Sequence, residues 1–135
     1  MNNQLRGKAA LLILALMSGA PGVWSEDLKT IQGEVVDPAL YLREGRHGKD
    51  VEELIFDAVD GGQALALLED GTGSLYLFLA GEPGADPNEL VYEYAGRSIK
   101  ATGPVYEKGG VRGIVVTDIE SLAGPAVAMP ADVEP

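Results

Sequence analysis

The chain of 135 residues contains no cysteine and only one histidine, so it has few of the side chains that bind soft metals or carry redox chemistry. Disulfide bonds are therefore excluded, even in an oxidising compartment where small domains commonly rely on them. A domain of this size has little stability in reserve. Its stability must come from the packing of apolar side chains.

Basic residues are also few: 10 lysines and arginines stand against 21 aspartates and glutamates, which gives a net charge of −11. Nucleic-acid binding depends mainly on Lys and Arg neutralising phosphates, so nucleic acid is a poor candidate partner. The same sign of charge disfavours adsorption to anionic lipid surfaces and favours solubility. Cations or a basic protein remain compatible partners, although most of the acidic surface is expected to be simply solvated.

The chain lacks an apolar run of about 20 residues, the length that a membrane-spanning helix requires. Its longest candidate, Ala9–Met17, is short and follows Arg6 and Lys8. The small-x-small tripeptide Val23-Trp24-Ser25 comes next, and the whole pattern predicts a secretory signal that is cleaved after Ser25. An uncleaved membrane anchor is the alternative.

The export route follows from two further absences. Without cysteine there is no lipoprotein route, and without paired arginines the general route is favoured over the twin-arginine one. Cleavage removes two basic residues, leaving eight basic and 21 acidic residues and a net charge of −13. We expect a periplasmic or secreted protein that is not stably membrane-bound after cleavage. Three parts are predicted: a signal peptide at 1–25, one folded domain at 26–122 and a disordered Ala/Pro-rich tail at 123–135.

The first half of the domain is predicted to contain one strand and one helix. Alternating apolar residues predict a strand over Thr30–Val36, which an Asp-Pro pair ends. The polar segment Tyr41–Gly48 predicts a loop. A helix is then expected over Val51–Val59, because Asp50 and Glu53 have the spacing of a capping box and two glycines follow the helix.

The middle of the domain predicts a hairpin followed by a second helix. The apolar segments Ala64–Leu68 and Leu75–Ala80 flank a glycine-rich turn and are predicted to pair as neighbouring strands. Its glycines resemble those of a phosphate loop, but the Gly-Lys-Ser/Thr ending is missing. Asp86 can cap a helix that begins at Pro87 and ends near Ala95.

The last part of the domain predicts another hairpin, with strands Ser98–Tyr106 and Val111–Glu120 joined by Glu107–Gly110. The complete order favours a mainly β (α+β) fold: a five-stranded OB-like barrel with one inserted helix after strand 1 and one helix between strands 3 and 4. An open α+β sheet is the alternative. Sharp bends or bulges are expected at three glycines inside strands, namely Gly33, Gly103 and Gly113.

Several of these segments resemble a group of small exported bacterial OB-fold-like proteins of uncharacterised function. The two most specific segments are Gly33–Asp37, with the sequence Gly-Glu-Val-Val-Asp, and Tyr106–Gly110, with the sequence Tyr-Glu-Lys-Gly-Gly. Shorter matches lie between them, at Tyr41-Leu42, Gly61-Gly62, Leu67-Leu68, Asp70-Gly71, Leu75–Leu77 and Thr102-Gly103. The resemblance covers Thr30–Glu120 and implies the fold more than a function.

Typical members of this group carry cysteines that would suit a metal or thiol site. The matching positions in this chain are Leu40, Leu54 and Ala58, all of them apolar. Such a site therefore does not carry over, which weakens an enzymatic interpretation. We expect these three side chains to pack in the core instead.

The best candidate for recognition is the one basic cluster of this acidic protein, Arg43–Lys49, which contains the only histidine. OB barrels use the loop after strand 1 for recognition, so ligand or partner binding is predicted for Tyr41, Arg43, Arg46 and His47. A lone imidazole can also serve as an acid, a base or a metal ligand, but more often it is a solvated loop residue.

Other candidate groups have ordinary structural explanations. Glu53 and Asp57 stand four residues apart and could bind Ca²⁺ weakly, yet acidic residues near a helix start usually form a solvated face. The aromatic residues Tyr76, Phe78, Tyr92, Tyr94 and Tyr106 could stack on sugars or bases, but their spacing is typical of core or half-buried rings. No catalytic residue, metal site or cofactor is predicted.

The composition and motifs together favour an exported, non-enzymatic binding or accessory module of the cell envelope. Its partner would be a small ligand or an envelope protein. The alternative is a metal-handling or enzymatic envelope protein that uses carboxylates and His47.

Overall fold

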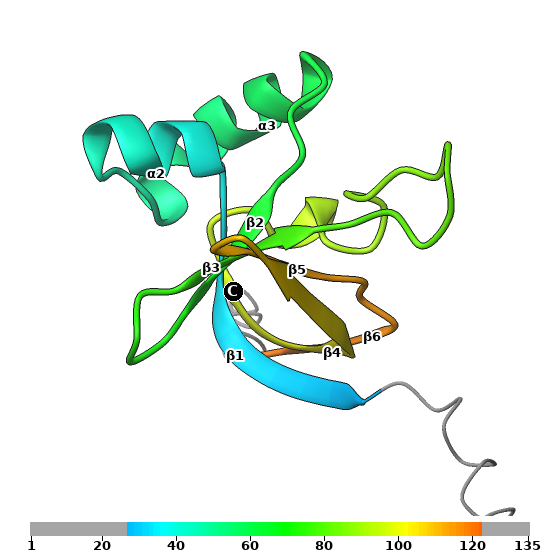
Figure 1. The fold of residues 1–135 in the computed structure, drawn as a ribbon. Helices are drawn as coiled ribbons and strands as arrows, with labels where there is room; N and C mark the ends of the chain where they lie inside the picture. Colours follow the sequence, from blue (N-terminus) through cyan, green and yellow to red (C-terminus); the bar gives the residue numbers. More distant parts are fainter. Residues whose placement is uncertain (1–26, 123–135) are drawn as a thin grey trace, which may run out of the picture.

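A computed structural model describes residues 27–122, and the predictions for residues 1–25 and 123–135 lie outside this range. The described strands are β1 (Leu28–Val36), β2 (Ala66–Glu69), β3 (Leu75–Phe78), β4 (Ser98–Lys108), β5 (Val111–Ile114) and β6 (Asp118–Ser121) (Figure 1). The helices are α2 (Pro38–Glu44) and α3 (Glu52–Asp60), with the 3-10 helices η2 (Lys49–Val51) and η3 (Tyr92–Tyr94). Within the described range, no helix is long and apolar enough to cross a bilayer.

Five strands close into a barrel in the order β1-β2-β3-β5-β4, because β4 returns to pair with β1. The neighbours are antiparallel except for β3 and β5, which run parallel. β6 pairs with the first half of β4, beyond the end of β5. The predicted OB-like barrel is therefore confirmed, and the open sheet is excluded.

A bend in β1 allows that strand to serve two neighbours. Gly33 pairs with Ile99 on β4 and with Glu69 on β2, so it lies where the two ladders overlap. A Cβ atom at this position would collide with the backbone carbonyl of Leu68. The predicted bend at Gly33 is thus a close approach of two backbones that only glycine permits.

The predicted strand Val111–Glu120 is divided by a bulge. Val105 pairs with Ile114, whereas Thr102 pairs with Asp118, so three residues on one strand face two on the other. Gly103 lies opposite the bulge, and a Cβ atom there would overlap the Val115 carbonyl oxygen. The extra residue ends β5 and starts β6 while both remain paired with β4.

Apolar side chains from the strands fill the barrel, including Val35, Leu67, Phe78, Ile99 and Ile114. The two α-helices lie together over one end of the barrel (Figure 1). Val51 and Ile55 complete the core from the helical side, and both are buried. The insertion between β1 and β2, residues 37–65, therefore covers one barrel end.

Helix α2 occupies part of the predicted loop Tyr41–Gly48, so that prediction is wrong for Tyr41–Glu44. The Asp37 side chain caps the helix by accepting from the Ala39 N–H at 3.0 Å, and Pro38 occupies its first turn. Gly45 closes the helix with a φ of 72°. The Asp-Pro pair therefore starts a helix as well as ending the strand.

The predicted first helix is present as α3, but its start and its buried face differ from the expectation. Asp50 lies in η2 and Val51 takes the N-cap position without a side-chain cap, so the expected capping box does not form. Leu54 is 42% exposed, which makes its assignment to the core wrong. Leu40 and Ala58 are half-buried; Leu40 packs against the core as expected, and Ile55 is the residue of α3 that is fully buried.

Of the helix predicted from Pro87 to near Ala95, between the third and fourth strands, only η3 is helical, a 3-10 helix of three residues. The Asp86 side chain accepts from the Asn88 N–H at 2.9 Å, as expected of a cap. Asn88 is itself buried: its amide oxygen accepts from the Leu65 N–H at 2.8 Å, and its amide donates to the Gln63 carbonyl at 3.0 Å. These tertiary hydrogen bonds hold the segment against the residues that lead into β2 and favour turns over a continuous α-helix.

Candidate functional site

The structure brings two of the four predicted recognition residues, Tyr41 and His47, into contact and leaves Arg43 and Arg46 exposed elsewhere on the insertion. Tyr41 is half-buried on α2, and Arg43 is exposed in the last turn of the same helix. Arg46 is exposed in the following loop, with its guanidinium 3.4 Å from the Glu44 carboxylate. His47 contacts Glu34 on β1.

The contact between Glu34 and His47 joins Oε1 of the carboxylate to Nδ1 of the imidazole at 2.9 Å. The Tyr41 ring meets the His47 ring edge-on, with centroids 5.6 Å apart. The other carboxylate oxygen of Glu34 is buried and has no hydrogen-bond partner among the described residues. Glu34 was not singled out from the sequence, although its place between the inward-facing Gly33 and Val35 indicates an outward side chain.

The Glu34–His47 pair resembles the arrangement in which a carboxylate orients an imidazole. The contact occupies Nδ1, so Nε2 is the ring nitrogen that can act on another group. Glu53 and Asp57 lie on the exposed side of α3. Residues 27–122 contain no group of three or more His, Asp or Glu side chains that could hold a metal ion.

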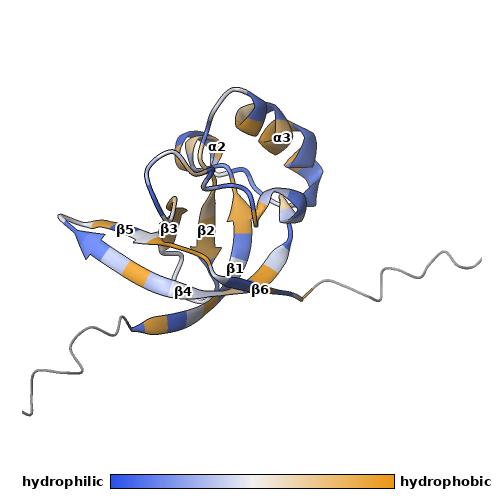
Figure 2. Cartoon of the chain, turned by 90° about the vertical axis from the view of Figure 1, so that its right-hand side faces the viewer, coloured by the Kyte–Doolittle hydropathy of each residue, from blue (hydrophilic) through white to orange (hydrophobic). Residues whose placement is uncertain are grey.

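A second candidate surface lies on the outer face of the barrel, over β3, β5 and the end of β4. Leu79, Tyr106 and Val111 are exposed there, the last at 57%. β2 and β3 are largely hydrophobic along their length, whereas β1 and β4 alternate (Figure 2). Both faces of β2 and β3 therefore carry apolar side chains, although only one face of a barrel strand packs in its core.

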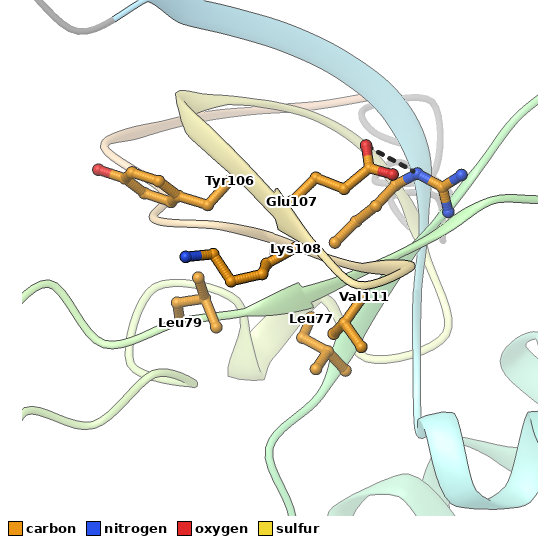
Figure 3. Close-up of a pocket in the computed structure, with 8 residues that line it drawn as sticks. Leu77, Leu79, Tyr106, Glu107, Lys108 and Val111 are labelled. Atoms are coloured by element: carbon orange, nitrogen blue, oxygen red, sulfur yellow. Dashed lines mark ion pairs between the residues drawn. The ribbon is translucent and has the colours of Figure 1, made fainter.

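These side chains surround a cavity of about 280 Å³. Leu77, Leu79, Tyr106 and Val111 provide its apolar lining (Figure 3). The lack of a side chain at Gly113 leaves room for Leu79. A Cβ atom on Gly113 would approach the Leu79 methyl group to 2.6 Å. The remaining lining residues are charged: Glu107, Lys108 and Arg112, with 3.8 Å between the Glu107 carboxylate and Nε of Arg112.

Two further cavities continue from the first. One of about 160 Å³ shares Leu79 with it and is also lined by Asp86, Leu90 and Val115. The next, of about 260 Å³, shares Glu89 and Leu90 with the second. The four predicted recognition residues line none of these three cavities.

Tyr76 lines none of the three cavities and packs against the barrel core. Tyr76 is half-buried on β3, and burial, followed by the negative charge of Glu69, raises the pKa of its phenol above the ordinary value of 10.0. Arg112 lowers the pKa in opposition, whereas a side-chain hydrogen bond with Glu69 raises it further. The neutral phenol is therefore the form that suits this site.

The aromatic residues divide between structure and surface. Phe78 is buried in the core, and Tyr94 packs against it as expected of half-buried rings. Tyr92 and Tyr106 are exposed at 42% and 45%. The sequence signal for the outer face was present in the unbroken apolar runs of Ala64–Leu68 and Leu75–Ala80, which lack the alternation of a half-buried strand.

No protein-family model matches this chain, and neither a curated protein nor a solved structure does so.

Proposed function

We propose that the protein is an exported, non-enzymatic binding module of the cell envelope that holds an apolar group on the outer face of its barrel. The observation that carries this proposal is the cavity lined by Leu77, Leu79, Tyr106 and Val111. Its volume is near the lower end of the range of small-molecule pockets, about 300 Å³, and suits one branched or aromatic group.

The physical argument is the cost of leaving this surface in water. Single exposed apolar residues are ordinary, but a contiguous and concave apolar group is typical of an interaction site. Complete burial of a Val or Leu side chain contributes about 1.5–3 kcal/mol, so a ligand that covers Val111 and Leu79 gains affinity without a charge contact. Loss of ligand freedom offsets part of that gain.

Export is part of this proposal. Its support is Arg6 and Lys8 ahead of the short apolar run Ala9–Met17, with a small-x-small site ending at Ser25. The envelope or the medium is then the place to look for the partner. Mass spectrometry of the mature protein should show a start at Glu26 or within a few residues of it. Recovery of the uncleaved chain in the cytosol would contradict export.

Site-specific photocrosslinking tests the binding face. A photoreactive phenylalanine analogue at Val111 should form adducts in the producing cells, because that side chain borders the cavity. Leu42 is the matched control, since it is 70% exposed and lies outside the three cavities. Adducts from Leu42 in the absence of adducts from Val111 would refute the proposal and direct attention to the insertion.

The Glu34–His47 contact favours a second candidate, a metal-handling or enzymatic envelope protein. Calorimetric titration with Zn²⁺, Cu²⁺ and Ca²⁺ tests it on the wild-type chain, on His47→Ala and on Glu34→Gln. Under our leading proposal, neither Zn²⁺ nor Cu²⁺ binds tightly, because one imidazole and one carboxylate are a weak ligand set. Stoichiometric binding that both substitutions abolish would favour the metal-handling alternative.

A further inference from the structure

The three cavities on the outer barrel face form one groove, because each shares lining residues with the next. Leu79 borders the first and second cavities, and Glu89 and Leu90 border the second and third. The groove begins at the β4–β5 hairpin and continues past the segment between β3 and β4. It ends beside Asp118 and Ile119 at β6.

Charge is divided unequally along this groove. The first cavity has one carboxylate, Glu107, and two cations, Lys108 and Arg112. The second and third cavities are lined by four carboxylates and by no lysine or arginine. These four residues form the acidic rim of the groove: Asp86, Glu89, Glu93 and Asp118. An occupant that fits both parts must be apolar at one end and cationic at the other.

We infer that the groove binds an extended peptide segment of a partner protein, with an apolar side chain in the first cavity and Lys or Arg side chains over the second and third. This inference rests on the proposed binding function of the outer face. An extended peptide advances about 3.3 Å per residue and its side chains alternate between two faces, so every second side chain can enter a successive cavity. The apolar anchor supplies affinity, and the carboxylates select cationic residues.

Charge disfavours the other occupants that this chain could provide or meet. A second copy of the mature chain would bring a net charge of −13 to a rim that is already acidic. The chain's own segment 123–135 contains Asp132 and Glu134 but no lysine or arginine, so it does not complement the rim. Nucleic acid and anionic glycans carry the same sign of charge as the carboxylates and are disfavoured for that reason.

Fluorescence anisotropy with three labelled peptides of otherwise identical sequence tests the inference. The first peptide has a leucine followed by two lysines at alternate positions. The second replaces both lysines with glutamates, and the third replaces the leucine with serine. We expect the first to bind best, with at least about tenfold weaker binding by each of the others. Added salt should weaken the first complex, because the rim contacts are exposed charges.

Protein variants locate the contacts. Glu89→Lys with Glu93→Lys should weaken binding of the first peptide by about tenfold, and so should Val111→Asp. Glu53→Lys with Asp57→Lys is the matched control, because it makes the same change of charge on the exposed side of α3. Circular dichroism and thermal melts verify that each variant is folded.

Three results would overturn the inference: binding of the glutamate peptide as tight as that of the lysine peptide, equal weakening by the α3 control variant, or no loss when serine replaces leucine. The second result would indicate attraction by net charge alone. Failure of all three peptides to bind, combined with crosslinks from Val111, would refute a basic peptide as the partner and leave the binding face in place. Failure of both experiments would refute the binding face as well.

Discussion

The insertion after β1 and the outer face of the barrel differ in the contacts that their side chains make within the protein. In the insertion, the conspicuous polar groups contact one another within the protein: His47 contacts Glu34 at 2.9 Å, and Arg46 lies 3.4 Å from Glu44. On the barrel face, Val111 and Tyr106 line a cavity and remain exposed. The insertion attracts attention as a candidate site through residue types that can bind or react, such as histidine and arginine. The barrel face is a candidate site because its apolar side chains are exposed.

The difference also extends to the backbone. Two strand glycines of the barrel, Gly33 and Gly103, lie where two backbones approach closely, and a Cβ atom at Gly103 would overlap the Val115 carbonyl. In the insertion, a Cβ atom at Gly45 would meet nothing within 4 Å. We therefore expect an added methyl group to be tolerated poorly at Gly103 and well at Gly45, a contrast that the first of the following changes tests.

The largest effect is expected for Gly103→Ala. Its methyl group has no space beside the bulge, so the loss of stability should exceed about 4 kcal/mol or prevent folding altogether. Gly45→Ala is the paired change in the insertion, where only the left-handed φ of 72° is unfavourable to alanine, and it should cost about 1 kcal/mol. Urea unfolding measures both. Similar losses at the two positions would abolish the contrast.

A pair of substitutions in α3 tests which side of that helix is buried. Ile55→Ala should lower the free energy of unfolding by about 2–5 kcal/mol, because Ile55 is fully buried in the core. Leu54→Ala should cost about 0.5 kcal/mol, since Leu54 is largely a surface residue. A larger loss at Leu54 than at Ile55 would show that the helix is rotated from its described position.

The smallest effect concerns the stability of the barrel at alkaline pH. The pKa of Tyr76 is raised in the folded protein, so an unfolded chain loses this proton at a lower pH than the folded chain does. The free energy of unfolding should therefore fall as the pH rises from about 10 through the higher folded pKa. Tyr76→Phe should reduce that dependence. Urea melts at increasing pH measure the slope, and identical slopes for the wild-type and Tyr76→Phe proteins would contradict the assignment.

The amino-acid sequence by itself determined where several barrel strands lie along the chain and which turns join them. The alternation in Thr30–Val36, the apolar run Leu75–Ala80 and the glycines after Lys108 are local signals, and β1, β3 and the β4–β5 hairpin form where those signals predict. Gly109 and Gly110 both adopt positive φ in that hairpin, as its turn requires. Such features depend on the conformational preferences of a few adjacent residues.

Tertiary structure decided which polar groups meet and which apolar groups stay exposed. Glu34 contacts His47 only because the insertion returns to β1, and Asn88 holds its segment in turns by bonding to Leu65 and Gln63. The side of α3 that is buried depends on how the helix lies on the barrel, since Leu54 and Ile55 are equally apolar in the sequence. The outer groove exists because β3, β5 and β6 gather residues that are far apart in the chain. Packing of distant segments, which local preference cannot specify, therefore located the candidate binding surface.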